Sequence, residues 1–340
     1  MYDIIIIGGG FYGCKIALHY HTKGKKVLII EKENDIMLRA SFNNQARVHN
    51  GYHYPRAFMT AESSHRNYER FITEFSPAIK FNFLMTYAIA KGSKTNADTF
   101  SKLYKEIGSP LYPVKPEVSA LLNNKLIEKA FTVEERVFDG NMFREIIREK
   151  LKCEEIAVML NTEVSSVSEG KVNLTNGKVI NTKRIINCTY ANINTLLKSS
   201  KLPQIPTRNE NTNMALIKVP KEFTNLGVTI MDGDFFAVMP FPAFNLHTIH
   251  HVKFTPMPGN HDEEMIKDAA RFLPILKKSE HIGTIKEVKT ILLANENDDG
   301  RPSLYKRDYG FNGFDIVLGS KLDTVYDMLE KLDEELNVVS

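Results

Sequence analysis

Residues 1–31 have the sequence MYDIIIIGGGFYGCKIALHYHTKGKKVLIIE, and the order of residue types predicts a strand, a tight turn, a helix and a second strand. The apolar runs Ile4 to Ile7 and Val27 to Ile30 supply the two strands, and the glycine-rich segment supplies the turn. This order is typical of a dinucleotide-binding unit.

The spacing GxGxxG falls on Gly8, Gly10 and Gly13. Gly8 permits the tight turn, Gly10 lets a pyrophosphate approach the backbone, and Gly13 lets the helix pack closely on the strand. The N-terminus of the helix favours phosphates through its free N–H groups and its dipole. Glu31 ends the second strand, where its carboxylate can accept hydrogen bonds from both hydroxyls of an adenosine ribose. NADP is disfavoured because its 2′-phosphate would meet this negative charge.

Composition places the chain among globular proteins. Its 340 residues are 43% hydrophobic, enough for a sizeable core and, by length, for about two domains. Lys and Arg number 44 against 41 acidic residues, so the net charge of +3 gives no reason to expect a nucleic-acid or membrane partner. The three cysteines lack metal-ligand spacing, so we expect no metal site and a reducing compartment.

No apolar run approaches the roughly 20 residues that span a bilayer, and the first apolar run is too short for a secretory signal. We therefore expect a soluble cytoplasmic protein. Its oligomeric state stays open.

Residues 33–58, ENDIMLRASFNNQARVHNGYHYPRAF, are too irregular in apolar spacing for one helix or strand. They contain the densest cluster of side chains suited to binding or proton transfer: Arg39, Asn43, Asn44, Gln45, Arg47, His49, His53, Tyr54 and Arg56. A surface loop without such a role would be richer in Lys, Glu and Ser.

Helical spacing predicts helices over residues 60–75, 99–107, 143–151, 262–276 and 323–336, with Asp139 capping the third. Antiparallel strands are expected from residue 81, and three prolines predict a loop over residues 110–116. Further strands are predicted at 157–160, 164–167, 171–174, 184–188, 214–219, 228–231, 235–239, 248–254, 289–294 and 315–318, with a turn at Asn176 and Gly177. Two β-rich blocks interrupt the α/β pattern, so the dinucleotide domain is expected to be discontinuous and closed by the last strand and helix.

The chain resembles the D-amino-acid oxidase-like FAD-dependent oxidoreductases, the superfamily of glycine oxidase and L-2-hydroxyglutarate dehydrogenase. Four separated segments carry the resemblance: GGGFYG with Glu31, NNQARVHNGYHYPRAF at 43–58, INCTYAN at 186–192, and Asp299 to Pro302 followed by FDIVLGS at 314–320. Two positions depart from the family. Tyr190 stands where members carry glycine, and residues 319–322 replace a His-Gly-Gly-type loop.

The resemblance implies an α/β protein with a Rossmann-like FAD-binding domain and a discontinuous antiparallel-sheet substrate domain. The first domain is expected to hold residues 1–80, 131–205 and 295–340, and the second 81–130 and 206–294. FAD is the implied cofactor. Its expected contacts are Gly8, Gly10, Phe11, Tyr12, Gly13, Glu31, Lys32, Asn44, Gln45, Arg47, Val164, Thr189, Gly319, Lys321 and Leu322.

The resemblance also implies the catalytic residues His49, His53, Tyr54 and Arg301, with Arg301 clamping a substrate carboxylate. A histidine beside the flavin can take a substrate proton, hydrogen-bond the flavin or carry it covalently; the alternative is a structural role. Arg47 and Tyr54 can instead bind the substrate or the FAD phosphates. Strand alternation places His250 and His251 on opposite faces, so only one of them can line a substrate cavity.

The predicted activity is oxidation of a C–N or C–O bond in a small carboxylate-bearing amine or 2-hydroxy acid, by hydride transfer to flavin. Two alternatives stay open: a flavoprotein acting on a sugar or nucleotide-sugar, and a flavin-binding protein without turnover.

Overall fold

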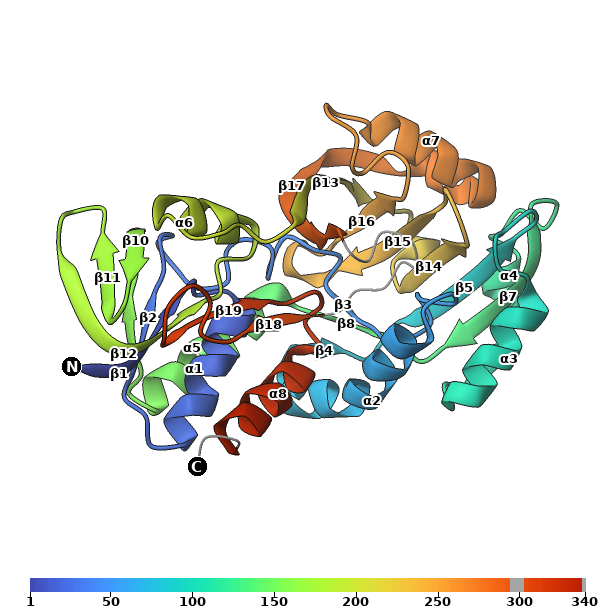
Figure 1. Ribbon diagram of the computed structural model, residues 1–340. Helices are drawn as coiled ribbons and strands as arrows, with labels where there is room; N and C mark the ends of the chain where they lie inside the picture. Colours follow the sequence, from blue (N-terminus) through green and yellow to red (C-terminus); the bar gives the residue numbers. More distant parts are fainter. Residues whose placement is uncertain (294–302, 338–340) are drawn as a thin grey trace.

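The computed structural model describes residues 1–293 and 303–337, and in these residues the strands form two large sheets and one small sheet (Figure 1). The first large sheet lies at the end of the molecule that holds the N-terminus. The second lies at the opposite end, and segments 33–58 and 134–139 pass between them.

Five parallel strands form the centre of the first sheet: in spatial order β19 (Phe314–Leu318), β12 (Val179–Asn187), β1 (Tyr2–Ile7), β2 (Val27–Ile30) and β9 (Ala157–Met159). Ile4 to Ile7 are all buried because both faces of β1 are covered. Ile4 and Ile6 pack with helix α1 (Phe11–Thr22), whereas Ile5 and Ile7 pack with α6 (Ile193–Ser199).

Antiparallel strands extend this sheet on either side of β12. The hairpin of β10 (Val164–Ser168) and β11 (Lys171–Leu174) joins β12 through a turn in which Gly177 has a φ of 84°. Strand β18 (Leu304–Lys306) pairs with β19. The predicted strand at 184–188 is thus corrected to the second half of one long strand that begins at Val179.

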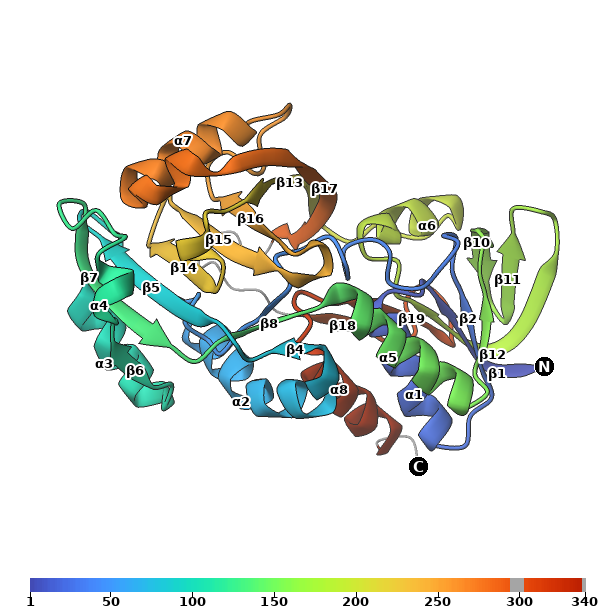
Figure 2. The ribbon, with the colours of Figure 1, turned by 180° about the vertical axis from the view of Figure 1, so that it is seen from behind.

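Four helices cover one side of the first sheet: α1, α2 (Phe58–Glu74), α5 (Gly140–Cys153) and α8 (Val325–Asn337). Figures 1 and 2 both show α8 lying between α1 and α2. As predicted, Asp139 caps α5, its carboxylate accepting from the backbone N–H groups of Asn141 at 2.9 Å and Met142 at 3.2 Å.

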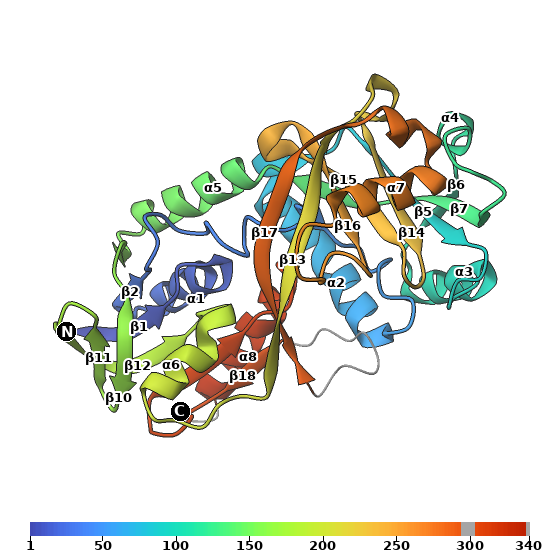
Figure 3. The ribbon, with the colours of Figure 1, turned by 90° about the horizontal axis from the view of Figure 1, so that it is seen from above.

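The second large sheet has eight strands. Their order is β17 (Glu280–Leu292), β13 (Thr207–Lys218), β16 (Leu246–His251), β15 (Phe236–Phe241), β14 (Leu226–Met231), β5 (Leu84–Ala90), β7 (Ile127–Val133) and β6 (Leu111–Pro113). Every pair is antiparallel except β5 and β14, which run parallel. Helix α7 (Asp262–Phe272) covers one face, and Figure 3 shows β13 and β17 as a long paired ribbon beside it.

The third sheet is small and lies between the other two. It consists of β3 (Arg47–Val48), β8 (Arg136–Phe138) and β4 (Ile79–Lys80), all antiparallel. The remaining helices are α3 (Ala97–Ile107), α4 (Pro116–Ser119) and the short 3-10 turns η1 (Ser76–Ala78), η2 (Tyr190–Asn192), η3 (Lys221–Phe223), η4 (Pro242–Phe244) and η5 (Pro274–Lys278).

The α/β fold class is confirmed, with a parallel dinucleotide-type sheet and a separate, mainly antiparallel sheet. Further local predictions are wrong. The segment 110–116 holds β6 and the start of α4 instead of a plain loop, and β5 has one parallel neighbour. Helix α7 ends at Phe272 because Pro274 cannot continue it, and β17 begins at Glu280, well before residue 289.

Within the described ranges 1–293 and 303–337, no helix is both long enough and apolar enough to cross a bilayer.

Candidate functional site

One cavity of about 980 Å³ runs from the glycine turn to the second large sheet. Among the residues that line it are nearly all of the predicted site residues: Gly8, Gly10, Phe11, Tyr12, Glu31, Lys32, Asn44, Gln45, Arg47, His49, His53, Tyr54, Val164, Thr189, Gly319, Lys321 and Leu322. Gly13 lies behind the turn, packed on β1. Arg301 lies outside the described residues, so its position stays a prediction.

The glycine turn is closed too tightly for side chains. A Cβ on Gly13 would lie 2.0 Å from the carbonyl oxygen of Gly8, and one on Gly8 would lie 2.7 Å from the carbonyl oxygen of Cys188. Gly8 also has a φ of 105°, which favours glycine. A Cβ on Gly10 would approach only the Ser41 hydroxyl, at 3.4 Å. The structure of the turn therefore requires glycine at positions 8 and 13. It does not require glycine at position 10, where the residue leaves space next to the backbone.

Glu31 follows β2 and reaches back over the glycine turn. Its Oε2 accepts a 2.6 Å hydrogen bond from the Gly9 N–H, and its Oε1 accepts one of 2.9 Å from the Glu33 N–H. These bonds fix the carboxylate at the cavity wall, beside Lys32. A fixed carboxylate at this place is suited to the hydroxyls of a ribose.

Tyr12 joins the glycine turn to the loop that precedes α8. Its hydroxyl donates to the carbonyl of Lys321 at 2.8 Å and lies 2.8 Å from the Thr324 hydroxyl. Its ring lies so close to Gly319 that a Cβ there would be 2.3 Å from Cε2. The first and the last segments of the resemblance thus form a single wall of the cavity, together with Leu322.

Thr189 and Tyr190 follow β12 at the same edge of the sheet. Thr189 donates from its N–H and hydroxyl to the Asn187 side chain, at 3.1 and 2.7 Å. Tyr190 has a φ of 51°, so it keeps the left-handed conformation that glycine would adopt. Its hydroxyl accepts from the N–H of Thr290 on β17 at 3.2 Å. The tyrosine therefore preserves the turn and adds a link to the second sheet.

The two amide side chains that were predicted to contact FAD, Asn44 and Gln45, have structural partners. Asn44 donates to the carbonyls of Ala40 and Ser41, both at 3.0 Å, and accepts from the Ala46 N–H at 2.7 Å. Gln45 donates to the carbonyl of Ala237 on β15 at 3.3 Å. Asn44 thus shapes its own loop, and Gln45 ties that loop to the second sheet.

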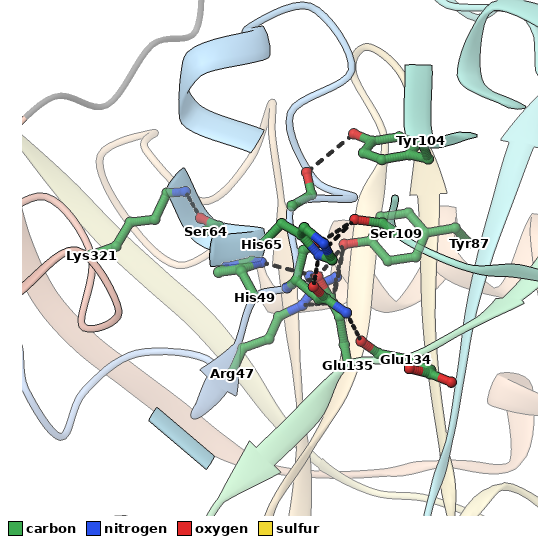
Figure 4. A network of polar contacts seen from close by, with 12 residues as sticks. Arg47, His49, Ser64, His65, Tyr87, Tyr104, Ser109, Glu134, Glu135 and Lys321 are labelled. Atoms are coloured by element: carbon green, nitrogen blue, oxygen red, sulfur yellow. Dashed lines mark hydrogen bonds and ion pairs between the residues drawn. The ribbon is translucent and has the colours of Figure 1, made fainter. Parts of the chain in front are cut away.

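Arg47 is at the centre of a buried polar network (Figure 4). Strands β3 and β8 bring it to Glu135, which accepts from Arg47 Nε at 2.9 Å and from Nη2 at 2.8 Å. Nη2 also donates to the Tyr87 hydroxyl, which in turn donates to Glu135. Glu135 is fully buried, and burial would raise its pKa, but the Arg47 charge and the His49 contact hold it at about 2. The carboxylate is therefore ionised.

His49 and His53 lie together on the cavity wall. Their ring centroids are 5.4 Å apart, and Tyr54 stands edge-on to both. Burial lowers the pKa of His49, an effect that Glu135 partly offsets. The pKa of His53 is lowered well below its ordinary value by burial and by the neighbouring Arg47 and His49. Both rings are thus neutral at physiological pH, and neither His49 Nδ1 nor His53 Nδ1 has a hydrogen-bond partner in the part of the chain that the structure describes.

Lys321, in the loop before α8, lies against Tyr54, the tyrosine that contacts His49 and His53. Its Nζ lies 3.7 Å from the centroid of the Tyr54 ring and donates to the Ser64 hydroxyl on α2. The cation–π contact fixes the ammonium group at the cavity wall.

Cationic side chains line the cavity beyond the histidines. Arg56 donates from Nε to Asp232 at 2.7 Å, and Asp232 also accepts from the Thr95 hydroxyl at 2.8 Å. Lys94 and His250 line the same cavity. His251, on the opposite face of β16, contacts Asp268 on α7 at 3.2 Å, as the strand alternation predicted. Arg56, Lys94 and Asp232 were not among the predicted site residues, although Arg56 belongs to the polar segment.

Glu135 was also not among the predicted site residues. It lies 88 positions from Arg47, and the only sequence signal is a glutamate directly before the apolar strand β8. Within the described part of the chain, no group of three or more His, Cys, Asp and Glu side chains is arranged to hold a metal ion.

The cavity residues fit FAD. The glycine turn leaves a concave backbone that a Cβ would fill, and Arg47 Nη1 is buried with no hydrogen-bond partner among the described residues. A buried guanidinium N–H with no acceptor, in the wall of a cavity, is a donor suited to an oxygen of a bound group. The fold and this site therefore define a dinucleotide-dependent enzyme.

The comparison with known proteins identifies the family. Residues 3–296 match the family described as FAD dependent oxidoreductase, and the chain belongs to this family. The members of this family are described as FAD-dependent oxidoreductases.

Similar proteins include an FAD-dependent monooxygenase of Fusarium mangiferae, 27% identical over 74% of this chain. A glycerol 3-phosphate dehydrogenase of Caloramator mitchellensis is 24% identical over 62% of this chain. The chain spans 64% and 47% of the lengths of these two relatives.

Two solved structures show the same fold along nearly the whole chain. Glycine oxidase from Geobacillus kaustophilus superposes with a TM-score of 0.75 at 14% identity, covering 97% of this chain and 95% of that chain. L-alpha-glycerophosphate oxidase from Mycoplasma pneumoniae, with FAD bound, gives 0.76 at 14% identity, covering 99% and 94%.

Proposed function

We propose that this protein oxidises a C–O or C–N bond in a small carboxylate-bearing substrate, a 2-hydroxy acid or an amine. The observation that carries the proposal is the buried, neutral pair His49 and His53, in the same cavity as the glycine turn. We propose further that the glycine turn, Glu31 and the loop before α8 hold FAD.

FAD, when bound, would supply the two-electron oxidant for removal of a hydride from the substrate carbon. The hydroxyl or amine of the substrate would have to lose a proton as the C=O or C=N bond forms. The electron acceptor of the reduced cofactor stays open. The chain must supply an acceptor for that proton. A neutral imidazole at the cavity wall meets this need, since its pKa leaves it unprotonated and ready to accept.

The cations in the cavity support an anionic substrate. Asp232 fixes the Arg56 guanidinium at the wall, and Lys94 lies on the same cavity. A guanidinium and an ammonium both bind carboxylates and phosphates through charge-assisted hydrogen bonds. The predicted clamp Arg301 stays a second candidate. The relative named glycerol 3-phosphate dehydrogenase agrees with a hydroxyl-bearing anionic substrate, although the anionic group of glycerol 3-phosphate is a phosphate and not a carboxylate.

The test is anaerobic reduction of the FAD-loaded protein by a panel of 2-hydroxy acids, amino acids, phosphorylated alcohols and neutral sugars. We expect the visible flavin absorbance to bleach with an anionic alcohol or amine, and His49→Asn to slow this bleaching. Bleaching by neutral sugars alone would favour the sugar alternative. Bleaching by dithionite but by no member of the panel would favour a flavin-binding protein without turnover.

A further inference from the structure

The buried carboxylate of Glu135 faces the histidine that the proposed reaction uses. His49 Nδ1 lies 3.5 Å from Glu135 Oε1 without forming a hydrogen bond to it, and this nitrogen is buried with no hydrogen-bond partner among the described residues. Glu135 is thus the carboxylate that faces it. Glu135 itself is fully buried and held by four donors, from Arg47 Nε and Nη2, the Asn50 N–H and the Tyr87 hydroxyl. A carboxylate with this many fixed partners cannot turn away from the ring.

We propose that Glu135 is a positioning residue: it keeps the proton of the neutral His49 ring on Nδ1, so that Nε2 is the nitrogen that accepts the substrate proton. This inference rests on the proposed function of His49. The chemistry is that of a carboxylate that orients an imidazole base, because a negative charge facing one ring nitrogen favours the proton there and leaves the other nitrogen free to accept.

Arg47 gives this arrangement a second property. Its guanidinium compensates the charge of Glu135, so that the carboxylate stays ionised without drawing a full proton onto His49. Removing either partner alone should therefore move the protonation of His49 in opposite directions. The titratable and charged groups that face His49 or its neighbour His53 are Glu135, Arg47, Lys321, Tyr54 and His250.

The first experiment measures the ring directly, by nitrogen NMR of isotope-labelled histidine in the FAD-loaded protein, with His49→Asn to assign the signal. We expect wild-type His49 to carry its proton on Nδ1. Arg47→Met should keep this tautomer and raise the pH at which the ring protonates, because the Glu135 charge is then uncompensated. The double variant Arg47→Met/Glu135→Gln should lose the tautomer preference.

The double variant is used because Glu135→Gln alone leaves Arg47 buried with no opposite charge, which is strongly destabilising. Arg47→Met leaves Glu135 in the same state, so its spectra are recorded under conditions in which unfolding measurements show the variant to be folded. Glu134→Gln is the matched control, since the side chain of Glu134 accepts from Tyr112 at the surface, away from the cavity. It should leave the tautomer and the titration unchanged.

The second experiment follows flavin reduction against pH with the substrate from the panel. At saturating substrate, the FAD-loaded double variant should reduce its flavin roughly 10- to 100-fold more slowly than the wild type. In Arg47→Met the acidic limb of the profile should move up by about one pH unit. A purely structural role for Glu135 predicts lower stability with an unchanged tautomer and unchanged limb, and this result would overturn the inference. If the tautomer behaves as expected but no compound reduces the wild-type flavin, the proposed function fails and the inference about the ring stands.

Discussion

The ring of Tyr12 lies against the α-carbon of Gly319, across 307 positions of sequence, and leaves no room for a side chain there. A Cβ on Gly319 would come within 2.3 to 2.6 Å of three ring atoms. The ring cannot swing aside without cost, because its hydroxyl is bonded to the carbonyl of Lys321 and to Thr324. This contact fixes the loop before α8 on the start of α1.

Gly319→Ala should therefore destabilise the protein by about 1–3 kcal/mol, the range for overpacking a well-packed site. It should also weaken FAD binding, since the displaced loop lines the cavity. Denaturant unfolding and FAD fluorescence titration measure the two effects. Gly283→Ala on β17 is the control, because a Cβ there meets nothing within 4 Å. Equal stability of the two variants would show that the contact is not tight.

Alanine substitutions at Gly10 and Gly13 should separate the contribution of the glycine turn to protein stability from its contribution to FAD binding. Gly13→Ala places a Cβ 2.0 Å from the Gly8 carbonyl oxygen, so we expect loss of folded protein. Gly10→Ala meets only the Ser41 hydroxyl at 3.4 Å, so the stability of the FAD-free protein should change by less than about 0.5 kcal/mol. Its FAD affinity should nevertheless fall at least about tenfold if the pyrophosphate approaches the backbone there. Wild-type affinity in Gly10→Ala would contradict this assignment of the turn.

Glu74 should make the protein sensitive to acid. It accepts from Lys15 of α1 at 2.6 Å, Lys150 of α5 at 2.8 Å and Tyr326 of α8 at 2.7 Å. Burial opposes its ionisation, but these partners lower its pKa from 4.5 to about 2. Because the folded-state pKa is the lower one, up to about 3 kcal/mol of stability is present above pH 4.5 and is lost as the pH falls toward 2.

Unfolding free energies measured from neutral pH down through this window test the prediction. Glu74→Gln should be less stable at neutral pH and should lose less stability on acidification. Glu69→Gln, at an exposed position of the same helix, is the control. If Glu74→Gln keeps the pH dependence of the wild type, the contacts of Glu74 with α1, α5 and α8 contribute little to the acid sensitivity of the protein.

Arg56 should affect substrate binding more than the chemical step. Arg56→Gln should raise the dissociation constant of the anionic substrate roughly 10- to 100-fold, the usual effect of losing a charge-assisted hydrogen bond. The limiting rate of flavin reduction should change by less than about threefold, because the base is a different residue. Stopped-flow reduction over a range of substrate concentrations separates the two. Arg66→Gln, on the outer side of α2 and paired with Asp327, should leave both unchanged.

The parts of the site that are local in sequence could be predicted from it. The glycine turn, Glu31 and the polar segment (residues 33–58) each lie within one short stretch of sequence. Residues from all three line one cavity. The division into residues 1–80, 131–205 and 295–340 against 81–130 and 206–294 stays a prediction, as do the individual roles of the site residues.

Contacts between residues far apart in the sequence could not be predicted from it. Glu135 meets Arg47 only because β3 and β8 pair, and Asp232 meets Arg56 only because β14 ends beside the polar segment. Neither carboxylate has a motif around it. Tyr190 shows a different limit of prediction from sequence. A tyrosine stands where the family has glycine, yet its backbone has the left-handed conformation typical of glycine. Its hydroxyl also accepts a hydrogen bond from β17, a contact that no local sequence pattern indicates.

The pairing of β19 with β12 also determines when the cofactor can be captured during synthesis. Residues 314–316 complete the parallel sheet beside residues 185–187, so the nucleotide-binding unit cannot close until the intervening second sheet has been made. Such distant contacts are slow to form and leave apolar edges exposed meanwhile. A ribosome-bound chain that stops before β19 should therefore be unable to retain FAD, even though its glycine turn has long since emerged.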